Sequence, residues 1–358
     1  MDAELSHTVF IRRPNLLRSD GGLELMPEIC LRVAEILIDS DPKIIGRLFL
    51  ISKSYNTLLM SYEKSVTKLF SRHKSQLKYV NGSKIMILSS QIGLKSTVLK
   101  IQTYPWLSEM RCRIATVKFL LENEITEMVN TIDGWPSLNV SKNELHLRSK
   151  WFKTNALFLL FRLADCAAGF HTTEAIRNQQ SKFLYSLSIR ELAFLGVMVE
   201  IIGHNFFIIT KRSILEYDIF KEPVRDLLPL QPTSHFNSIS EEQINHLNGD
   251  DWIRETMCVF EDLIQRYGPF FALAYLEGPK RNFKQPYQWA CNKIKEGLKN
   301  MNSFELGYTM SYASLQSVVW RVFVQKYGCS GKDSWIIAKG LVENEMMAYR
   351  SDENSHFF

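Results

Sequence analysis

Two long stretches that are apolar on nearly every face constrain this chain more than any other feature of its sequence. They read NALFLLFRLADCAAGF over residues 155–170 and ELAFLGVMVEIIGHNFFIIT over residues 191–210. A helix that is apolar all round is either buried in the core of a large protein or embedded in a membrane. The second stretch carries Glu200 and His204 near its middle and lacks stop-transfer flanks. We therefore predict that both stretches are core helices of a helical body.

Amphipathic segments extend this helical pattern over most of the chain. Apolar residues recur at helical spacing over 109–132, and Gly134 follows as a breaker. A well-bounded helix is expected over 251–267, where Gly268 provides the stop signal. Three more helical segments follow in the C-terminal third, over 286–300, 303–328 and 333–350. The sequence therefore predicts an all-α fold.

Composition divides the chain into four parts. Residues 1–22 end in the sequence SDGG and are expected to be loosely ordered. Residues 221–250 hold three prolines and many polar side chains, which is typical of a border between helical regions. We therefore predict a loosely ordered N-terminus over 1–22, a small helical module over 23–75, a central helical domain over 76–230, and a C-terminal helical region over 231–358 that packs on the central domain.

The charge pattern indicates neither nucleic acid nor a membrane as the partner. The formal net charge of +5 comes from mixed signs, and the Lys and Arg residues are scattered rather than gathered into a basic stripe. The N-terminal residues lack the positive start and long apolar run of an export signal. The six cysteines are widely separated, which favours reduced and mostly buried thiols. We therefore expect a cytoplasmic or nuclear protein.

No segment carries a catalytic, cofactor-binding or metal-binding motif. The sequence GCSGKDS over 328–334 has only two residues between its glycines, and Asp333 stands where a phosphate-binding loop needs Ser or Thr. We interpret it as a turn at a helix end. No CxxC or HExxH pattern offers a zinc site. Trp320, Phe323 and Tyr327 recur at helical spacing, which indicates core packing rather than a base-stacking surface.

Two pairs of polar side chains interrupt the apolar stretches. Arg162 and Asp165 are three residues apart, so they can form an ion pair on one face of a helix. Glu200 and His204 are four residues apart, a spacing that allows an acid/base dyad. Neither pair comes with a nucleophile or a third metal ligand, and buried ion pairs mostly serve helical cores. We therefore expect no catalysis from either pair.

The segment LMPEICLRVAEILIDSDPKIIGRLFLISKSYNTLL, residues 25–59, forms three short apolar-periodic helices around the turn DSDP. Pro27 suits the first turn of the first helix, where its missing N–H costs nothing. The residues that then lie on one face of that helix are Ile29, Val33, Ile36 and Leu37. Helices this short bury little by themselves, so an apolar surface is left for another surface to cover.

Residues 25–59 resemble an F-box, the small three-helix module that links ubiquitin ligases to their substrates. The opening Leu25-Met26-Pro27-Glu28-Ile29 is similar to the Leu-Pro-x-Glu-Ile start of that family, with Met26 where the first proline is usual. In ISKSYNTLL, Ser52 takes the place of a cysteine and Tyr55 that of a tryptophan. The continuation MSYEKSVTKLF resembles a group of F-box-like proteins from filamentous fungi.

The resemblance implies a non-catalytic adaptor without a cofactor. Its N-terminal module would bind the Skp-type adaptor protein of a cullin ligase, and its irregular multi-helix body would recruit a target protein for ubiquitin transfer. The residues expected to contact the partner or to shape the contact are Leu25, Pro27, Ile29, Val33, Leu37, Leu48, Ile51 and Tyr55.

Two other functions stay open on the sequence. In the first, the protein is an α-helical scaffold or regulator, and its F-box-like helices serve only as core. In the second, it is an enzyme with a pocket between helices 155–170 and 191–210. That enzyme would need Arg162, Asp165, Glu200 and His204 to converge on one cavity.

Overall fold

The computed structural model describes most of the chain and confirms the predicted all-α class. The described residues are 25–41, 44–67, 86–88, 98–122, 134–135, 138–216, 249–276, 284–302 and 314–349. The predicted N-terminal part, 1–22, and residues 221–248 of the predicted border lie outside them.

The chain divides into two compact units. Unit 1 comprises Met1–His73 and Gln102–Ser108, and unit 2 comprises Lys74–Ile101 and Glu109–Phe358. The helix α5 (Tyr104–Glu122) contributes its first residues to unit 1 and the remainder to unit 2. The residues predicted as a central and a C-terminal region therefore belong to one unit, except for residues 102–108, which belong to unit 1.

Unit 1 contains the three helices predicted over residues 25–59. They are α1 (Pro27–Ser40), α2 (Ile44–Phe49) and α3 (Lys53–Ser61), and each contacts the other two. The first position of α1 is Pro27, as predicted. The Ser52 hydroxyl caps α3 by accepting a hydrogen bond from the Tyr55 backbone N–H at 3.1 Å. Tyr104, the first residue of α5, packs on this unit, and its hydroxyl donates a hydrogen bond to the Leu59 carbonyl at 2.8 Å.

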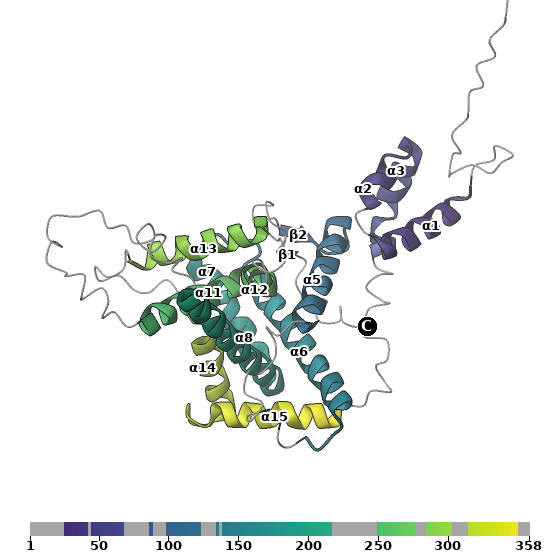
Figure 1. Cartoon of the computed structure of the whole chain (residues 1–358). Coiled ribbons are helices and arrows are strands. Elements are labelled where there is room, and N and C mark those ends of the chain that lie inside the picture. The colour runs from purple at the N-terminus through teal and green to yellow at the C-terminus, as the bar shows by residue number, and fades with distance from the viewer. Residues whose placement is uncertain are drawn as a thin grey trace, which may run out of the picture. The chain divides into compact units, whose positions relative to one another are not determined.

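Unit 2 is built around two long helices, α6 (Lys142–Asp165) and α8 (Ile189–Glu216), which pack against each other. They contain the two stretches predicted to be core helices. Around them lie α7 (Thr173–Ser186), α11 (Gly249–Tyr267), α12 (Pro269–Leu276), α13 (Lys284–Asn302), α14 (Leu315–Tyr327) and α15 (Ser334–Ala348). Helix α8 contacts α6, α11, α14 and α15, so it is the central element of the unit (Figure 1).

The apolar character of α8 is explained by burial inside unit 2. Among the described residues, its segment Ile189–Ile208 is long and apolar enough to cross a membrane. An 18-residue stretch of this segment is 72% buried by the rest of the structure. Its close packing against α14 needs a glycine. A Cβ at Gly196 would lie 2.9 Å from the Trp320 ring. The predicted core packing is confirmed for Phe323, which is fully buried, and for Trp320, which is partly buried against the core, but it is wrong for Tyr327, which is 44% exposed.

The boundary between α11 and α12 shows why the sequence signal at Gly268 is strong. Gly268 has a φ of +72°, which residues with a Cβ seldom adopt. A Cβ there would also come within 2.9 Å of the Phe161 ring. Helix α11 ends at Tyr267, as predicted, and Pro269 begins α12, since proline is well tolerated at the first helical position.

Several local features differ from the prediction. Helix α5 begins at Tyr104 rather than at residue 109, with Pro105 in its first turn, and residues 123–132 of the predicted helix lie outside the described part. The strands β1 (Met86–Leu88) and β2 (Val98–Lys100) pair antiparallel, with Ile87 opposite Leu99. They were not predicted, because each contributes only three residues to a period-2 pattern.

The cysteines are all free thiols, but most of them are not buried. Only Cys30 and Cys166 are buried, and the other four are half-buried. The prediction of mostly buried thiols is therefore wrong. Those four lie on helices or at a helix end, where the degree of burial depends on packing against distant segments that apolar periodicity does not encode.

Candidate functional site

The eight residues expected at a partner interface are divided between the surface and the core of unit 1. Four are exposed: Pro27, Ile29, Val33 and Ile51. Two are half-buried: Leu25 and Leu37. The remaining two, Leu48 and Tyr55, are each only 3% exposed. The exposed and half-buried residues are thus available to a partner, whereas Leu48 and Tyr55 shape the helices that carry them.

Tyr55 joins α3 to α1 from inside the module. Its hydroxyl donates a hydrogen bond to the Cys30 carbonyl at 3.1 Å. Burial raises the pKa of the Tyr55 phenol above its ordinary value, and the neighbouring Cys30 thiol adds to the effect. The phenol therefore stays protonated and keeps donating at physiological pH. This contact sets the distance between the two helices.

Helix α1 has two apolar faces, and the smaller side chains form the buried one. Cys30, Ala34 and Ile38 are spaced four residues apart and are buried. The short side chains of the first two let α1 approach α3 closely enough for the Tyr55 hydrogen bond. Of the α1 residues expected on the partner-facing side, Ile29 and Val33 are exposed and Leu37 is half-buried.

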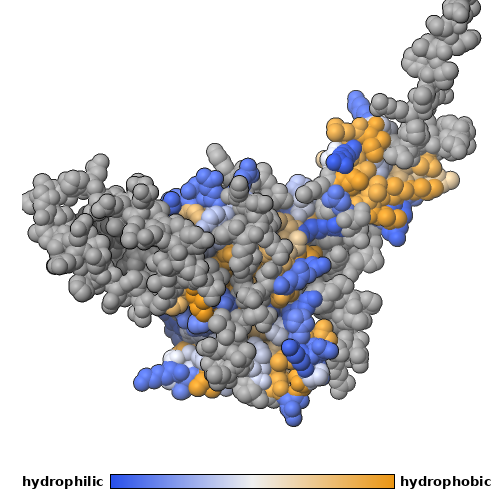
Figure 2. Space-filling view, in the orientation of Figure 1, coloured by the Kyte–Doolittle hydropathy of each residue, from blue (hydrophilic) through white to orange (hydrophobic). Residues whose placement is uncertain are grey.

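The second apolar face of α1 points to solvent. Met26 is 67% exposed, Ile29 47%, Val33 45% and Ile36 57%. Their spacing of three, four and three residues places them in one stripe along the helix, which we call the α1 stripe. Figure 2 shows apolar side chains gathered over this part of unit 1. Further exposed apolar residues of unit 1 are Leu50, Ile51, Met60 and Tyr62.

Met26 and Ile36 are exposed members of the α1 stripe that were not among the candidate contact residues predicted from the sequence. Met26 was interpreted only as a replacement for a family proline, and Ile36 was placed on the same helix face as Ile29 and Val33 without being named as a contact residue. The signal that identifies them is the second run of apolar residues on one helix. A helix packs on the core of its own module through one apolar face. A second apolar face on the same helix therefore stays exposed and is available to a partner.

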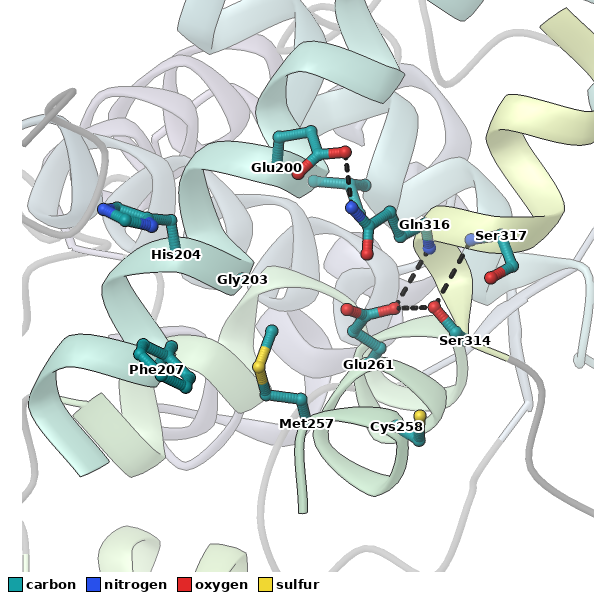
Figure 3. A pocket seen from close by; sticks show the side chains of 11 residues that line it. Glu200, Gly203, His204, Phe207, Met257, Cys258, Glu261, Ser314, Gln316 and Ser317 are labelled. Atoms are coloured by element: carbon teal, nitrogen blue, oxygen red, sulfur yellow. Dashed lines mark hydrogen bonds between the residues drawn. The ribbon is translucent and has the colours of Figure 1, made fainter. Parts of the chain in front are cut away.

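A second candidate site lies entirely in unit 2, where a cavity of about 440 Å³ opens between α8, α11 and the start of α14. Residues from three helices line it: Val199, Glu200, Gly203, His204, Phe207, Met257, Cys258, Glu261, Ser314, Gln316 and Ser317. Figure 3 shows Glu200 and Glu261 on the two sides of Gln316, and His204 directed away from both carboxylates.

Both carboxylates of this cavity are held by neighbouring donors. Glu261 accepts from the Ser314 hydroxyl and, at 3.0 Å, from the Gln316 backbone N–H. Glu200 accepts from the Trp320 indole N–H at 2.7 Å and from the Gln316 side-chain amide. Burial raises the pKa of Glu261 above its ordinary value, and the Glu200 charge adds to this, while the hydrogen bonds from Ser314 and Gln316 act in the opposite direction.

The four residues required by the enzyme hypothesis do not come together at this cavity. Glu200 and His204 line it, but Arg162 and Asp165 do not. The predicted pairing of Arg162 with Asp165 is also wrong. Asp165 instead accepts from both terminal nitrogens of Arg113, at 2.8 and 2.7 Å. The Arg113 guanidinium on α5 donates to both oxygens of the Asp165 carboxylate. This two-bond geometry is the strong form of an arginine–carboxylate pair.

The described residues contain no group of three His, Cys, Asp or Glu side chains arranged to hold a metal ion. Comparisons with known proteins identify no relative, since no family model, curated protein or solved structure matches the chain. Among the described residues, the α1 stripe and the unit 2 cavity are therefore the two features that indicate a function.

Proposed function

We propose that this chain is a non-catalytic F-box-like adaptor. In this proposal unit 1 binds the Skp-type adaptor protein of a cullin ubiquitin ligase, and unit 2 recruits a target protein. The site of action would be the cytoplasm or the nucleus. The single observation that carries the proposal is the α1 stripe, which lies on the segment whose sequence resembles an F-box.

The α1 stripe supports binding of a protein partner for energetic reasons. Four neighbouring apolar side chains that are about half-exposed leave a continuous strip of apolar surface in water. Covering such surface contributes about 25 cal/mol per Å². Each of the four residues would then supply roughly 1 kcal/mol when a partner buries it. An apolar strip of this kind is a common feature of helix-mediated association.

The internal contacts of unit 1 support the same function. Leu48 and Tyr55 are buried within the module, and Tyr55 fixes α3 against α1. The stripe is thus presented on a packed element, which lowers the ordering cost of binding. Ser52, which stands where the family has a cysteine, serves as the N-cap of α3 and so keeps a structural role.

The mechanism would be proximity. An adaptor that holds a target near a ubiquitin-charged enzyme raises the effective concentration of the target at that enzyme without contributing a reacting group. This agrees with the division of the chain into a small unit with an exposed apolar stripe and a large unit with its own core.

A direct binding assay with a purified Skp-type adaptor tests the proposal. The variant Ile29→Asp/Val33→Asp places two charges in the α1 stripe, and we expect at least about a 100-fold loss of affinity, because each charge loses its hydration at the interface. The matched control is Ser61→Asp/Ser65→Asp, which adds the same charges at exposed polar positions of the same unit. It should bind like the wild type.

The thermal melt of each variant distinguishes the adaptor from the scaffold alternative. Ile29 and Val33 are about half-exposed, so the double substitution should leave the melt of unit 1 intact. If this variant unfolds, its side chains serve as core and the scaffold function is favoured. Wild-type protein that does not bind the adaptor would remove the proposal.

A further inference from the structure

We propose that the cavity between α8, α11 and α14 is a binding site for an organic cation, an ammonium group carried on an apolar body. Its volume of about 440 Å³ suits a small molecule. The site lies wholly within unit 2, so it is independent of the adaptor function proposed for unit 1.

The charge of the cavity lining favours a cation. Among the described residues, two carboxylates, Glu200 and Glu261, line it, and no Lys or Arg does. His204 is the one basic side chain that the described part of the lining contains, and it is exposed and directed away from the carboxylates (Figure 3). An anion would meet two like charges here, whereas a cation would compensate them in a partly desolvated site.

Glu261 places one oxygen at the disposal of a ligand. The residue is 3% exposed, its hydrogen bonds with Ser314 and Gln316 both end on Oε2, and the Leu315 backbone is a further hydrogen-bond donor to the carboxylate. Oε1 lies against α8, at 3.6 Å from the point where a Cβ of Gly203 would stand. The missing side chain at Gly203 thus leaves room beside Oε1. Glu200 is arranged in the same way, since its two hydrogen bonds both end on Oε1.

The remaining lining explains why an organic cation fits better than a metal ion. A metal ion usually needs three or more protein ligands when it is held without substrate, and the described residues offer no such group. The cavity is also far larger than an ion. Val199, Phe207 and Met257 supply apolar and aromatic surface for a hydrocarbon body, and an aromatic face also attracts an ammonium group.

Protonation of Glu261 should be linked to binding of the cation. Burial and the charge of Glu200 raise the pKa of this carboxyl. A bound ammonium group would oppose both causes and favour the ionised form. Binding should therefore strengthen as the pH rises through the range in which Glu261 loses its proton.

The test uses the full chain and three six-carbon probes of matched shape: hexylammonium, hexan-1-ol and hexanoate. Isothermal titration calorimetry at neutral pH should show saturable binding of hexylammonium with a Kd of about 1 mM or tighter. The neutral alcohol should bind at least about tenfold more weakly, and hexanoate more weakly still. Equal affinities for the three probes, or no binding of hexylammonium, would overturn the proposal.

Two variants and one control locate the binding. Gly203→Ala adds a methyl group beside Glu261 Oε1 at ordinary van der Waals distance, so the fold is kept while the cavity narrows. We expect about a fivefold or greater loss of hexylammonium affinity. Glu261→Gln removes the charge and should cost about tenfold or more. Glu174→Gln removes an exposed carboxylate outside the cavity and should change nothing.

These variants show whether hexylammonium binds in the cavity even when one of them does not fold. If Glu261→Gln does not fold, Gly203→Ala and the three probes still give the answer. Unchanged affinity in a folded Gly203→Ala protein, or the same loss in Glu174→Gln as in Glu261→Gln, would show that hexylammonium binds elsewhere.

Discussion

Replacing Arg113 by methionine should strongly destabilise unit 2. Arg113 is buried on α5, where its guanidinium donates to Glu109 at 2.8 Å and to both oxygens of Asp165 at 2.8 and 2.7 Å. The side chains of these three residues are 3%, 0% and 9% exposed. Burial lowers the pKa of Arg113, but the Asp165 and Glu109 carboxylates outweigh it and raise the value overall. The guanidinium therefore stays charged.

The size of the effect follows from what the substitution leaves behind. In Arg113→Met, two buried carboxylates lose the guanidinium that lies between them, and breaking a buried ion pair in this way costs about 3–5 kcal/mol. In Asp165→Asn, Arg113 keeps Glu109, so the remaining pair is neutral and the loss should be smaller, about 1–2 kcal/mol. The prediction therefore includes that Arg113→Met loses more stability than Asp165→Asn.

Urea unfolding of the full chain, together with hydrogen exchange of the α5 and α6 amides, measures this loss. Hydrogen exchange is needed because two units need not unfold in one step. The control is Arg190→Met, since the Arg190 side chain is 70% exposed and its ion pair with Glu345 lies at the surface. It should cost less than about 1 kcal/mol. A loss below about 1 kcal/mol in Arg113→Met, or a larger loss in Asp165→Asn, would refute the reasoning.

Two further predictions concern packing and pH. In Gly297→Ala the new Cβ would stand 2.3 Å from Val259 Cγ1, so α13 must move away from α11 and thermal unfolding should show a loss of about 1–3 kcal/mol. Gly340→Ala on α15 is the control, because its Cβ meets nothing within 4 Å and the better helix propensity should raise stability by up to about 1 kcal/mol. The raised pKa of Glu261 means that its protonated form favours the folded state, so its contribution to stability is complete below the unfolded pKa and is lost as the pH rises through the folded one. The free energy of unfolding of the wild type should therefore fall relative to Glu261→Gln between about pH 4 and pH 8, and a constant difference between the two proteins over that range would contradict the assignment.

The helical elements of this protein could largely be predicted from local patterns. The apolar stretches in α6 and α8 are buried as expected, because a helix without a polar face is stable only where water is excluded. The end of α11 was predicted from Gly268, whose positive φ few other residues adopt. Pro27 likewise marks the start of α1. Each of these signals acts within a few residues of the chain.

The candidate sites were predicted less completely, because they depend on which surfaces meet. On α1, two apolar faces compete for one module core, and the face with Cys30 and Ala34 is buried since its small side chains allow the closest approach to α3. The cavity in unit 2 brings Glu200 beside Glu261, which lies 61 positions further along the chain. No spacing rule connects residues so far apart.

The sequence by itself determined the helical class, the two core helices and the three short helices of residues 25–59, because periodicity and capping act locally. The tertiary structure decided which apolar stripe of α1 faces solvent, that Asp165 pairs with Arg113 rather than Arg162, and that two glutamates share a cavity. The physical reason is that a local pattern specifies which side chains share one face of a helix, whereas burial of that face depends on what packs against it. Its partner is chosen by the packing of helices distant in the chain.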